Sequence, residues 1–190
     1  MTSGGRVDDK SRAKQEAGFA IRVGEIPTGG VQRMLRLDEV TTTVKAAVDA
    51  EVTGFEAQVA IGEPDGRKAV DVEVGLRLAY RTACDRCGEP VEVQLESAET
   101  LRYQPDAPGS GGPSDPEEVE LSEDELDVGW YTDGTLSLAD VVSEAIALAL
   151  PMRNACEDTA GCDARTAKLL EGASEQAGGH PGFAALKNWT

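Results

Sequence analysis

Apolar and polar residues alternate over Ala69–Tyr80, and this pattern constrains the fold of the chain more than any other. From Val70 to Tyr80 every second residue is a large apolar one, and the residues between them are mostly polar. Successive side chains of a β-strand point to opposite faces of its sheet. The period of two therefore predicts a long strand with one face in a core.

Two further strands are predicted on either side of this one along the chain. Phe55–Ile61 is a first run, and Glu63–Arg67 has the Pro and Asp-Gly chemistry of a turn, so the first two strands form an antiparallel hairpin. Val91–Leu101 alternates again and follows the tight segment CDRCGEP. Three strands with one apolar face need a cover.

A helix downstream is predicted to provide that cover. Ser137 has the character of its N-cap, with Asp140 in the reciprocal position of a capping box. Apolar residues from Leu138 to Ala149 keep helical spacing, and Pro151 ends the pattern. We therefore expect one amphipathic helix packed on the sheet.

These elements predict an α+β fold. It consists of an antiparallel β-sheet, hairpin-rich and partly barrel-like, with one amphipathic helix packed on it and short C-terminal helices. Upstream, Gly18–Val23 and Val31–Leu37 are further candidate strands, and Asp38–Ala50 is either a helix or an edge element. Downstream, Ala164–Glu171 and Phe183–Asn188 are the expected short helices.

The expected organisation has five parts. They are a disordered N-terminal tail (1–17), an antiparallel sheet region with a Cys-x-x-Cys knuckle (18–103), a flexible acidic loop (104–127), a helical part that packs on the sheet (128–171), and a linker with a C-terminal short helix (172–190). The loop is rich in Pro, Gly, Ser and acidic residues, so it has too little apolar surface to offset the entropy of ordering it.

Negative charge is concentrated in one stretch of the chain. The formal net charge is −17, and between Tyr103 and Met152 there are twelve acidic residues and no Lys or Arg. Affinity for a nucleic-acid backbone comes mainly from Lys and Arg, so unspecific coating of RNA or DNA is disfavoured and a basic protein partner is favoured. Because the chain has neither a run of about 18 apolar residues nor an apolar signal core, we expect a cytoplasmic protein with no membrane segment.

Four cysteines form two close pairs, Cys84 with Cys87 and Cys156 with Cys162. Thiols stay reduced in the cytoplasm, so a metal site or plain thiols come before disulfides. Four thiolates in a tetrahedron suit Zn²⁺, and Gly88 would let backbone amides face the sulfurs of the first pair. The second pair has five intervening residues, more than the usual two to four. Four isolated reduced thiols are therefore favoured, and a zinc site is the alternative.

Catalytic chemistry finds little support in these residues. A redox Cys-x-x-Cys motif begins a helix, whereas Cys84 lies between strands. His180 has no Ser or Cys nucleophile paired with it in sequence, and the glycines of Gly109–Gly112 precede neither a strand nor a helix, as a phosphate-binding loop would. The acidic run Glu117–Asp127 has the character of a solvated charge cluster. We therefore expect no enzymatic activity and no small-molecule substrate.

Three blocks of sequence carry a likeness to a known family. They are Cys84–Pro90 before a strand, Thr135–Pro151 after the acidic loop, and His180–Asn188. Together, and in this order, they resemble the YceD family of large-subunit ribosomal RNA accumulation proteins. The matched positions are Cys84, Arg86, Cys87, Gly88, Pro90, Glu144, Leu150, Pro151, Phe183, Leu186 and Lys187.

The resemblance implies a bacterial cytoplasmic protein that is needed for normal accumulation of the large-subunit ribosomal RNA and has no known catalytic activity. Many relatives with extra cysteines carry a fuller set after the helix, ending in a second Cys-x-x-Cys-Gly. Here only Cys156 and Cys162 remain, and Asp163-Ala-Arg165 replaces the downstream pair. This departure bears on the metal site rather than on the family.

Three hypotheses for function follow. In the preferred one, charge drives the docking of a basic ribosomal protein or a pre-large-subunit particle, through the acidic residues Glu117, Glu118, Glu120, Glu123, Asp124 and Glu125. In the second, RNA binds directly to Arg77, Arg81 and Arg86. In the third, the protein is a zinc-stabilised protein-interaction adaptor unrelated to ribosomes.

Overall fold

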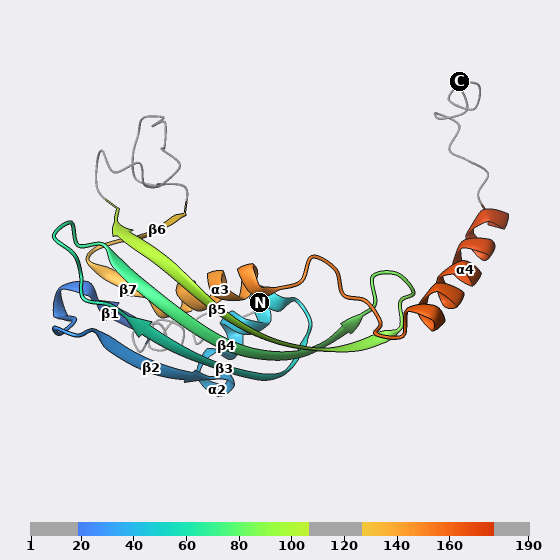
Figure 1. Ribbon diagram of the computed structural model, residues 1–190, viewed down its shortest axis with the longest axis horizontal. Helices are drawn as coiled ribbons and strands as arrows, with labels where there is room; N and C mark the ends of the chain where they lie inside the picture. The colour runs from blue at the N-terminus through green and yellow to red at the C-terminus, as the bar shows by residue number, and fades with distance from the viewer. Residues whose placement is uncertain (1–18, 107–126, 177–190) are drawn as a thin grey trace, which may run out of the picture. The chain divides into compact units, whose positions relative to one another are not determined.

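The computed structural model describes residues 19–106 and 127–176 (Figure 1). The expected tail 1–17, nearly all of the expected acidic loop and the block from His180 to Asn188 lie outside the described residues. The described elements are, in chain order, β1 (Ala20–Arg22), the 3₁₀ helix η1 (Val23–Glu25), β2 (Val31–Arg36), α2 (Leu37–Val48), β3 (Glu51–Ile61), β4 (Val70–Ala83), β5 (Pro90–Pro105), β6 (Val128–Tyr131), β7 (Thr135–Ser137), α3 (Leu138–Ala149) and α4 (Thr159–Gln176).

The described residues divide into two compact units. The sheet unit contains residues 19–80, 93–106 and 127–150, and the cysteine unit contains residues 81–92 and 151–176. The ends of β4 and β5 that meet at the Cys-x-x-Cys turn belong to the cysteine unit. The predicted α+β fold class is confirmed.

Five strands form the main sheet, in the order β2-β3-β4-β5-β6. β2 pairs antiparallel with β3, whereas β6 pairs parallel with β5. A separate two-stranded antiparallel sheet joins β1 to β7. Among the strands that the structure describes, β2 and β6 are the edges of the main sheet, so its barrel-like character stops short of closure.

The period of two in the sequence sets the two faces of this sheet. On β4 every second residue from Val70 to Tyr80 is buried, and nearly all those between them are exposed, as predicted. The predicted turn at 63–67 is held by Asp65, whose carboxylate accepts the N–H groups of Arg67 at 2.8 Å and Ala69 at 2.9 Å. A slip of this hairpin by one residue would expose its apolar face, so the burial of that face specifies the register.

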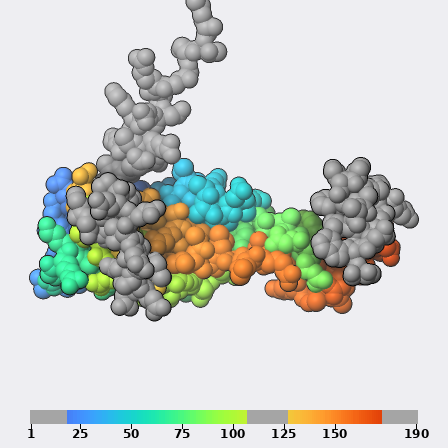
Figure 2. All heavy atoms as spheres, turned by 90° about the horizontal axis from the view of Figure 1, so that it is seen from above, coloured from blue at the N-terminus to red at the C-terminus, as the bar shows by residue number. Residues whose placement is uncertain are grey.

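Two helices cover the buried face of the sheet. Figure 2 shows α2, in cyan, beside α3, in orange, and the two helices contact each other. The segment Asp38–Ala50, which the sequence left open between helix and edge element, is therefore mostly helix. The two helices contribute these buried residues to the core: Val40 and Val44 from α2, and Leu138, Val141, Val142, Ala145 and Ile146 from α3.

Helix α3 begins and ends where the sequence predicts. Ser137 Oγ accepts the backbone N–H of Asp140 at 3.3 Å, which caps the first turn. Leu150 leaves the helical region with a ψ of 134°, because the ring of Pro151 disfavours a helical conformation in the preceding residue. No helix in the described part of the chain combines the length and the apolar character that crossing a membrane requires.

Two segments differ from the prediction. Residues 128–137 lie in the expected helical part, but Val128–Tyr131 form β6 and Thr135–Ser137 form β7. In β6, Trp130 and Tyr131 favour extended backbone. Helix α4 has 18 residues and continues through Gly172, where we expected a linker. A glycine inside a helix destabilises it by only about 1 kcal/mol, and the helix formers on both sides of Gly172 offset this.

Candidate metal centre

The first two cysteines lie in a tight turn between β4 and β5. Cys84 N–H donates to the Glu89 carbonyl at 2.7 Å, and Gly88 N–H donates to the Cys84 carbonyl at 2.9 Å. Gly88 adopts a φ of +76°, a left-handed conformation that glycine reaches without a Cβ clash. We call Cys84–Gly88 the knuckle; it buries the side chains of both Cys84 and Cys87.

The other two cysteines come from a loop and a helix. Cys156 lies in residues 150–158, which form neither helix nor strand, and it is half-buried. Cys162 lies in the first turns of α4 and is fully buried. Asp158 starts this helix, because its carboxylate accepts Gly161 N–H at 3.0 Å. The two cysteines are thus held in different ways.

Three polar contacts hold the segment after α3 and the start of α4 against the knuckle, within the cysteine unit. Asp85 N–H donates to the Asn154 carbonyl at 2.8 Å, and Asn154 N–H donates to Asp85 Oδ2 at 2.6 Å. Arg86 forms an ion pair of 2.5 Å with Asp163, the residue after Cys162. Residues far apart in the sequence are joined through the residues beside the cysteines.

The four sulfurs converge on one point. Cys84 Sγ lies 3.7 Å from Cys162 Sγ, Cys87 Sγ lies 3.5 Å from Cys156 Sγ, and all four sulfurs lie within 4.8 Å of one another. Thiolates about 2.3 Å from a tetrahedral Zn²⁺ ion lie about 3.8 Å apart, whereas bonded sulfurs of a disulfide lie about 2.05 Å apart. The four thiols are free, and their spacing and chemistry fit Zn²⁺.

The surroundings divide the thiols into two kinds. Backbone N–H groups of Cys87 and Arg86 lower the pKa of Cys84 to about 6, and the Arg165 guanidinium with Glu89 N–H lowers the pKa of Cys87. The hydrogen bond to Cys87, together with burial, raises the pKa of Cys156. Burial raises the pKa of Cys162 to about 12. The knuckle therefore supplies the thiolates that ionise first, and a full ligand set requires deprotonation of the other pair.

Arg165, one turn after Cys162 on α4, reaches the same cluster. Its Nη2 donates to Cys156 Sγ at 3.5 Å, and the same side chain lowers the pKa of Cys87. These sulfurs raise the pKa of the guanidinium. Arg165, Asp85 and Asn154 were not predicted from the sequence as parts of this site. Only the helical spacing of Cys162 and Arg165 could have indicated that the two side chains share a face.

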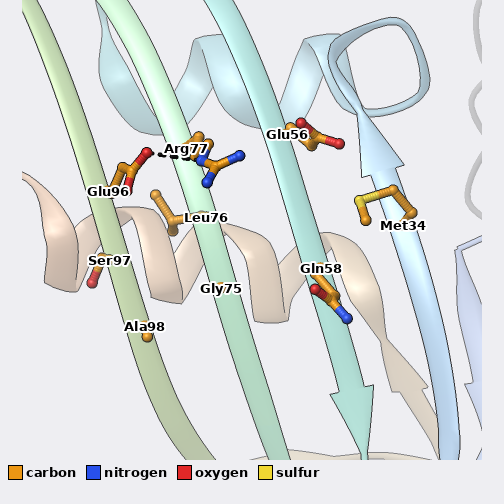
Figure 3. Close-up of a pocket in the computed structure, with 9 residues that line it drawn as sticks. All are labelled: Met34, Glu56, Gln58, Gly75, Leu76, Arg77, Glu96, Ser97 and Ala98. Atoms are coloured by element: carbon orange, nitrogen blue, oxygen red, sulfur yellow. Dashed lines mark hydrogen bonds and ion pairs between the residues drawn. The ribbon is translucent and has the colours of Figure 1, made fainter.

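The three arginines predicted to bind RNA each meet a carboxylate. Arg77 Nε lies 2.8 Å from Glu96 on the exposed face of the sheet. Figure 3 shows the pair with Glu56 on the neighbouring strand β3 and Met34 beyond it on β2, and these residues line a hollow of about 440 Å³. Arg81 Nε lies 2.8 Å from Glu92, and Arg86 pairs with Asp163 as described above. Their positive charges are balanced locally, which weakens the hypothesis of a basic strip.

The acidic residues predicted to bind a partner lie outside the described residues. These are Glu117, Glu118, Glu120, Glu123, Asp124 and Glu125. Phe183, Leu186 and Lys187 of the family motif lie outside them as well. The structure therefore places the knuckle and the end of α3 from the predicted motif, with Glu144 accepting a hydrogen bond from Tyr103.

A family model described as "Large ribosomal RNA subunit accumulation protein YceD" matches residues 72–189. The chain belongs to the YceD family. The match includes most of β4, the knuckle, α3 and all four cysteines, so the candidate metal centre lies inside the YceD region. No curated protein and no solved structure matches the chain.

Proposed function

We propose that this YceD protein supports accumulation of the large-subunit ribosomal RNA as a non-enzymatic factor in the cytoplasm. It binds a basic ribosomal protein or the pre-large-subunit particle, and zinc in the four-cysteine centre stabilises its fold. Membership of the YceD family is the observation that carries the role in RNA accumulation. The remaining parts of the proposal rest on charge and on the ligand set.

Charge favours a cationic partner over naked RNA. The chain carries −17 overall, with twelve acidic residues and no basic ones between Tyr103 and Met152. RNA binding by this stretch of the chain would require Lys and Arg side chains to replace the counterions of the phosphates. Arg77, Arg81 and Arg86 are already paired with carboxylates. Complementary charge would instead speed the association with a basic protein.

The ligand set supports a structural role for the metal. All four candidate ligands are cysteines, and a site closed by four protein ligands keeps no position for a water or substrate. When bound, zinc would join the knuckle to Cys156 and Cys162 and add its binding free energy to folding. Reduced thiols are also what a cytoplasmic protein retains.

The test is capture of partners from a bacterial lysate with the tagged full-length protein, at low salt and at about 0.5 M salt. We expect a basic ribosomal protein or large-subunit precursors at low salt and a strong loss at high salt. Neutralising the acidic residues of Glu117–Asp127 to Gln and Asn should abolish capture, whereas the matched variant Arg77→Gln/Arg81→Gln should retain it.

The alternatives give different results in the same experiment. Direct RNA binding predicts that Arg77→Gln/Arg81→Gln loses the ribosomal material and that the acid-neutralised variant keeps it. An adaptor unrelated to ribosomes predicts stoichiometric zinc, as the proposal also does, but no ribosomal material in the capture and no sedimentation alongside large-subunit precursors in a sucrose gradient. Either pattern would contradict the proposal.

A further inference from the structure

Arg165 has an unusual environment for an arginine of a surface helix. The guanidinium donates to Cys156 Sγ at 3.5 Å and lowers the pKa of Cys87, and its Nε is buried with no hydrogen-bond acceptor among the described residues. No carboxylate of the described residues lies within ion-pair distance of it, whereas the nearby Arg86 pairs with Asp163. The hydrogen bond that it donates is therefore to sulfur, and the Asp158 carboxylate lies near the guanidinium beyond ion-pair distance, since Asp158 Oδ2 and Arg165 Nη1 both lie beside Gly161.

The negative charge of a zinc-filled centre gives a physical reason for the contact between Arg165 and the cysteine sulfurs. Four thiolates around one Zn²⁺ ion carry a net charge of −2, and the Arg86–Asp163 pair adds nothing. Arg165 reduces that charge to −1 in a chain that is already strongly negative. Groups that hydrogen bond a metal ligand orient it and tune its affinity for the metal.

The four cysteines differ in how firmly the rest of the protein positions them. Cys84 and Cys87 are positioned by the backbone hydrogen bonds of the knuckle, and Cys162 by helix α4, where its N–H donates to the Asp158 carbonyl at 3.0 Å. Cys156 lies outside any helix or strand and is the least buried of the four. It is also the cysteine to which Arg165 donates at 3.5 Å.

We propose that Arg165 is a positioning residue of the metal centre, whose guanidinium holds the loop ligand Cys156 in the coordination sphere and offsets the charge of the thiolates. The inference rests on the proposed zinc site and adds a residue that no cysteine pattern identifies. Helix α4 then supplies both a ligand, Cys162, and the counter-charge, three residues later on the same face.

The experiment uses the full-length protein with Arg165→Gln, Arg165→Lys and the control Lys168→Gln, which removes one positive charge from an exposed position of the same helix. Zinc affinity is measured by competition with a chromogenic chelator. The order in which the cysteines react with an alkylating agent is mapped by mass spectrometry. Arg165→Gln should lower zinc affinity by about 10–100-fold, and Cys156 should become the first cysteine to react.

The conservative variant separates charge from geometry. Arg165→Lys keeps the charge without the planar fork of donors and should recover part of the affinity, while Lys168→Gln should match the parent protein. Equal affinities for Arg165→Gln and Lys168→Gln would overturn the inference. So would equal exposure of all four cysteines, accompanied by loss of helical circular dichroism. If the parent protein binds no zinc, the metal centre itself is wrong and the inference is overturned with it.

Discussion

The hydroxyl of Tyr103 donates a 2.5 Å hydrogen bond to Glu144 Oε2, and this bond links strand β5 to helix α3 inside the sheet unit. Tyr103 is buried, and its ring lies against Gly129 of β6. One side chain thus contacts the helix and the neighbouring strand at once. Glu144 is one of the positions that the resemblance to the YceD family predicts as matched, and this contact gives it a structural role.

Tyr103→Phe should lower the free energy of unfolding by about 1 kcal/mol, because the carboxylate loses its donor while the ring keeps its packing. The measurement is urea unfolding at pH 8, followed by circular dichroism. Tyr131→Phe is the matched control for a phenol that donates to a neutral acceptor, the Lys68 carbonyl at 2.7 Å. A loss for Tyr103→Phe no greater than experimental error would show that water replaces the bond.

Alkaline pH should destabilise the sheet unit through the same tyrosine. Burial, followed by the hydrogen bond and negative charge of Glu144, raises the pKa of Tyr103 above its usual value of about 10. The unfolded chain therefore releases this proton first, and the stability contributed by Tyr103 is lost as pH rises above about 10. Between pH 9 and 11, Tyr103→Phe should lose less stability than the parent protein. Parallel curves would contradict this assignment.

Gly129→Ala should destabilise the sheet unit by about 1–3 kcal/mol, since a methyl group there overpacks the core. An ideal Cβ at this position would lie 2.4 Å from Cε1 of Tyr103. The control is Gly75→Ala on the exposed face of β4, where a Cβ meets nothing within 4 Å. Thermal unfolding compares the two variants, and equal melting temperatures would refute the close packing of β6 on Tyr103.

Gly88→Ala should weaken the metal centre through backbone strain alone. The residue has a φ of +76°, and an added Cβ would meet no atom within 4 Å. Left-handed backbone is disfavoured by roughly 1–2 kcal/mol for a residue with a side chain. We expect zinc affinity to fall by about 5–30-fold in a chelator competition. Gly172→Ala, inside α4, should leave zinc affinity unchanged and stabilise the helix.

Removal of zinc should loosen the cysteine unit and leave the sheet unit folded. The protein purified under reducing conditions should contain one zinc ion per chain by elemental analysis, and Cys84→Ser and Cys162→Ser should lack it. After chelation, hydrogen exchange should accelerate in residues 84–92 and 151–166 while Phe55–Ile61 of β3 stays protected. Exchange that rises equally in both regions would argue against two separate units.

The sheet and α3 could be predicted because their signals are local and repeated. The period of two over β4 and the cap and proline that bound α3 each involve residues close in sequence. Strands β1, β6 and β7 have only three or four residues, too few for a periodic pattern to show. The parallel pairing of β6 with β5 also follows a segment of more than 20 residues, which carries no register information.

The four-cysteine cluster could be predicted only in part. Spacing of two to four residues identifies a pair of ligands in one turn, and Cys84 and Cys87 obey it. Cys156 and Cys162 do not form such a turn, because one lies in a loop and the other in a helix. Their spacing therefore led to the prediction of isolated thiols. That prediction is wrong, because the four sulfurs converge. Arg165 carries no signal of its own in the sequence.

The separation of the ligands along the chain determines when the centre can assemble during synthesis. Cys84 and Cys162 are 78 positions apart, so the knuckle leaves the ribosome long before its last ligand is made. In the interval Cys84 and Cys87 are an incomplete chelate, exposed to competing metals and oxidants. Closing so long a loop costs only slightly more entropy than closing a short one. Synthesis of the C-terminal portion, rather than the entropy of loop closure, therefore limits when the four cysteines can come together.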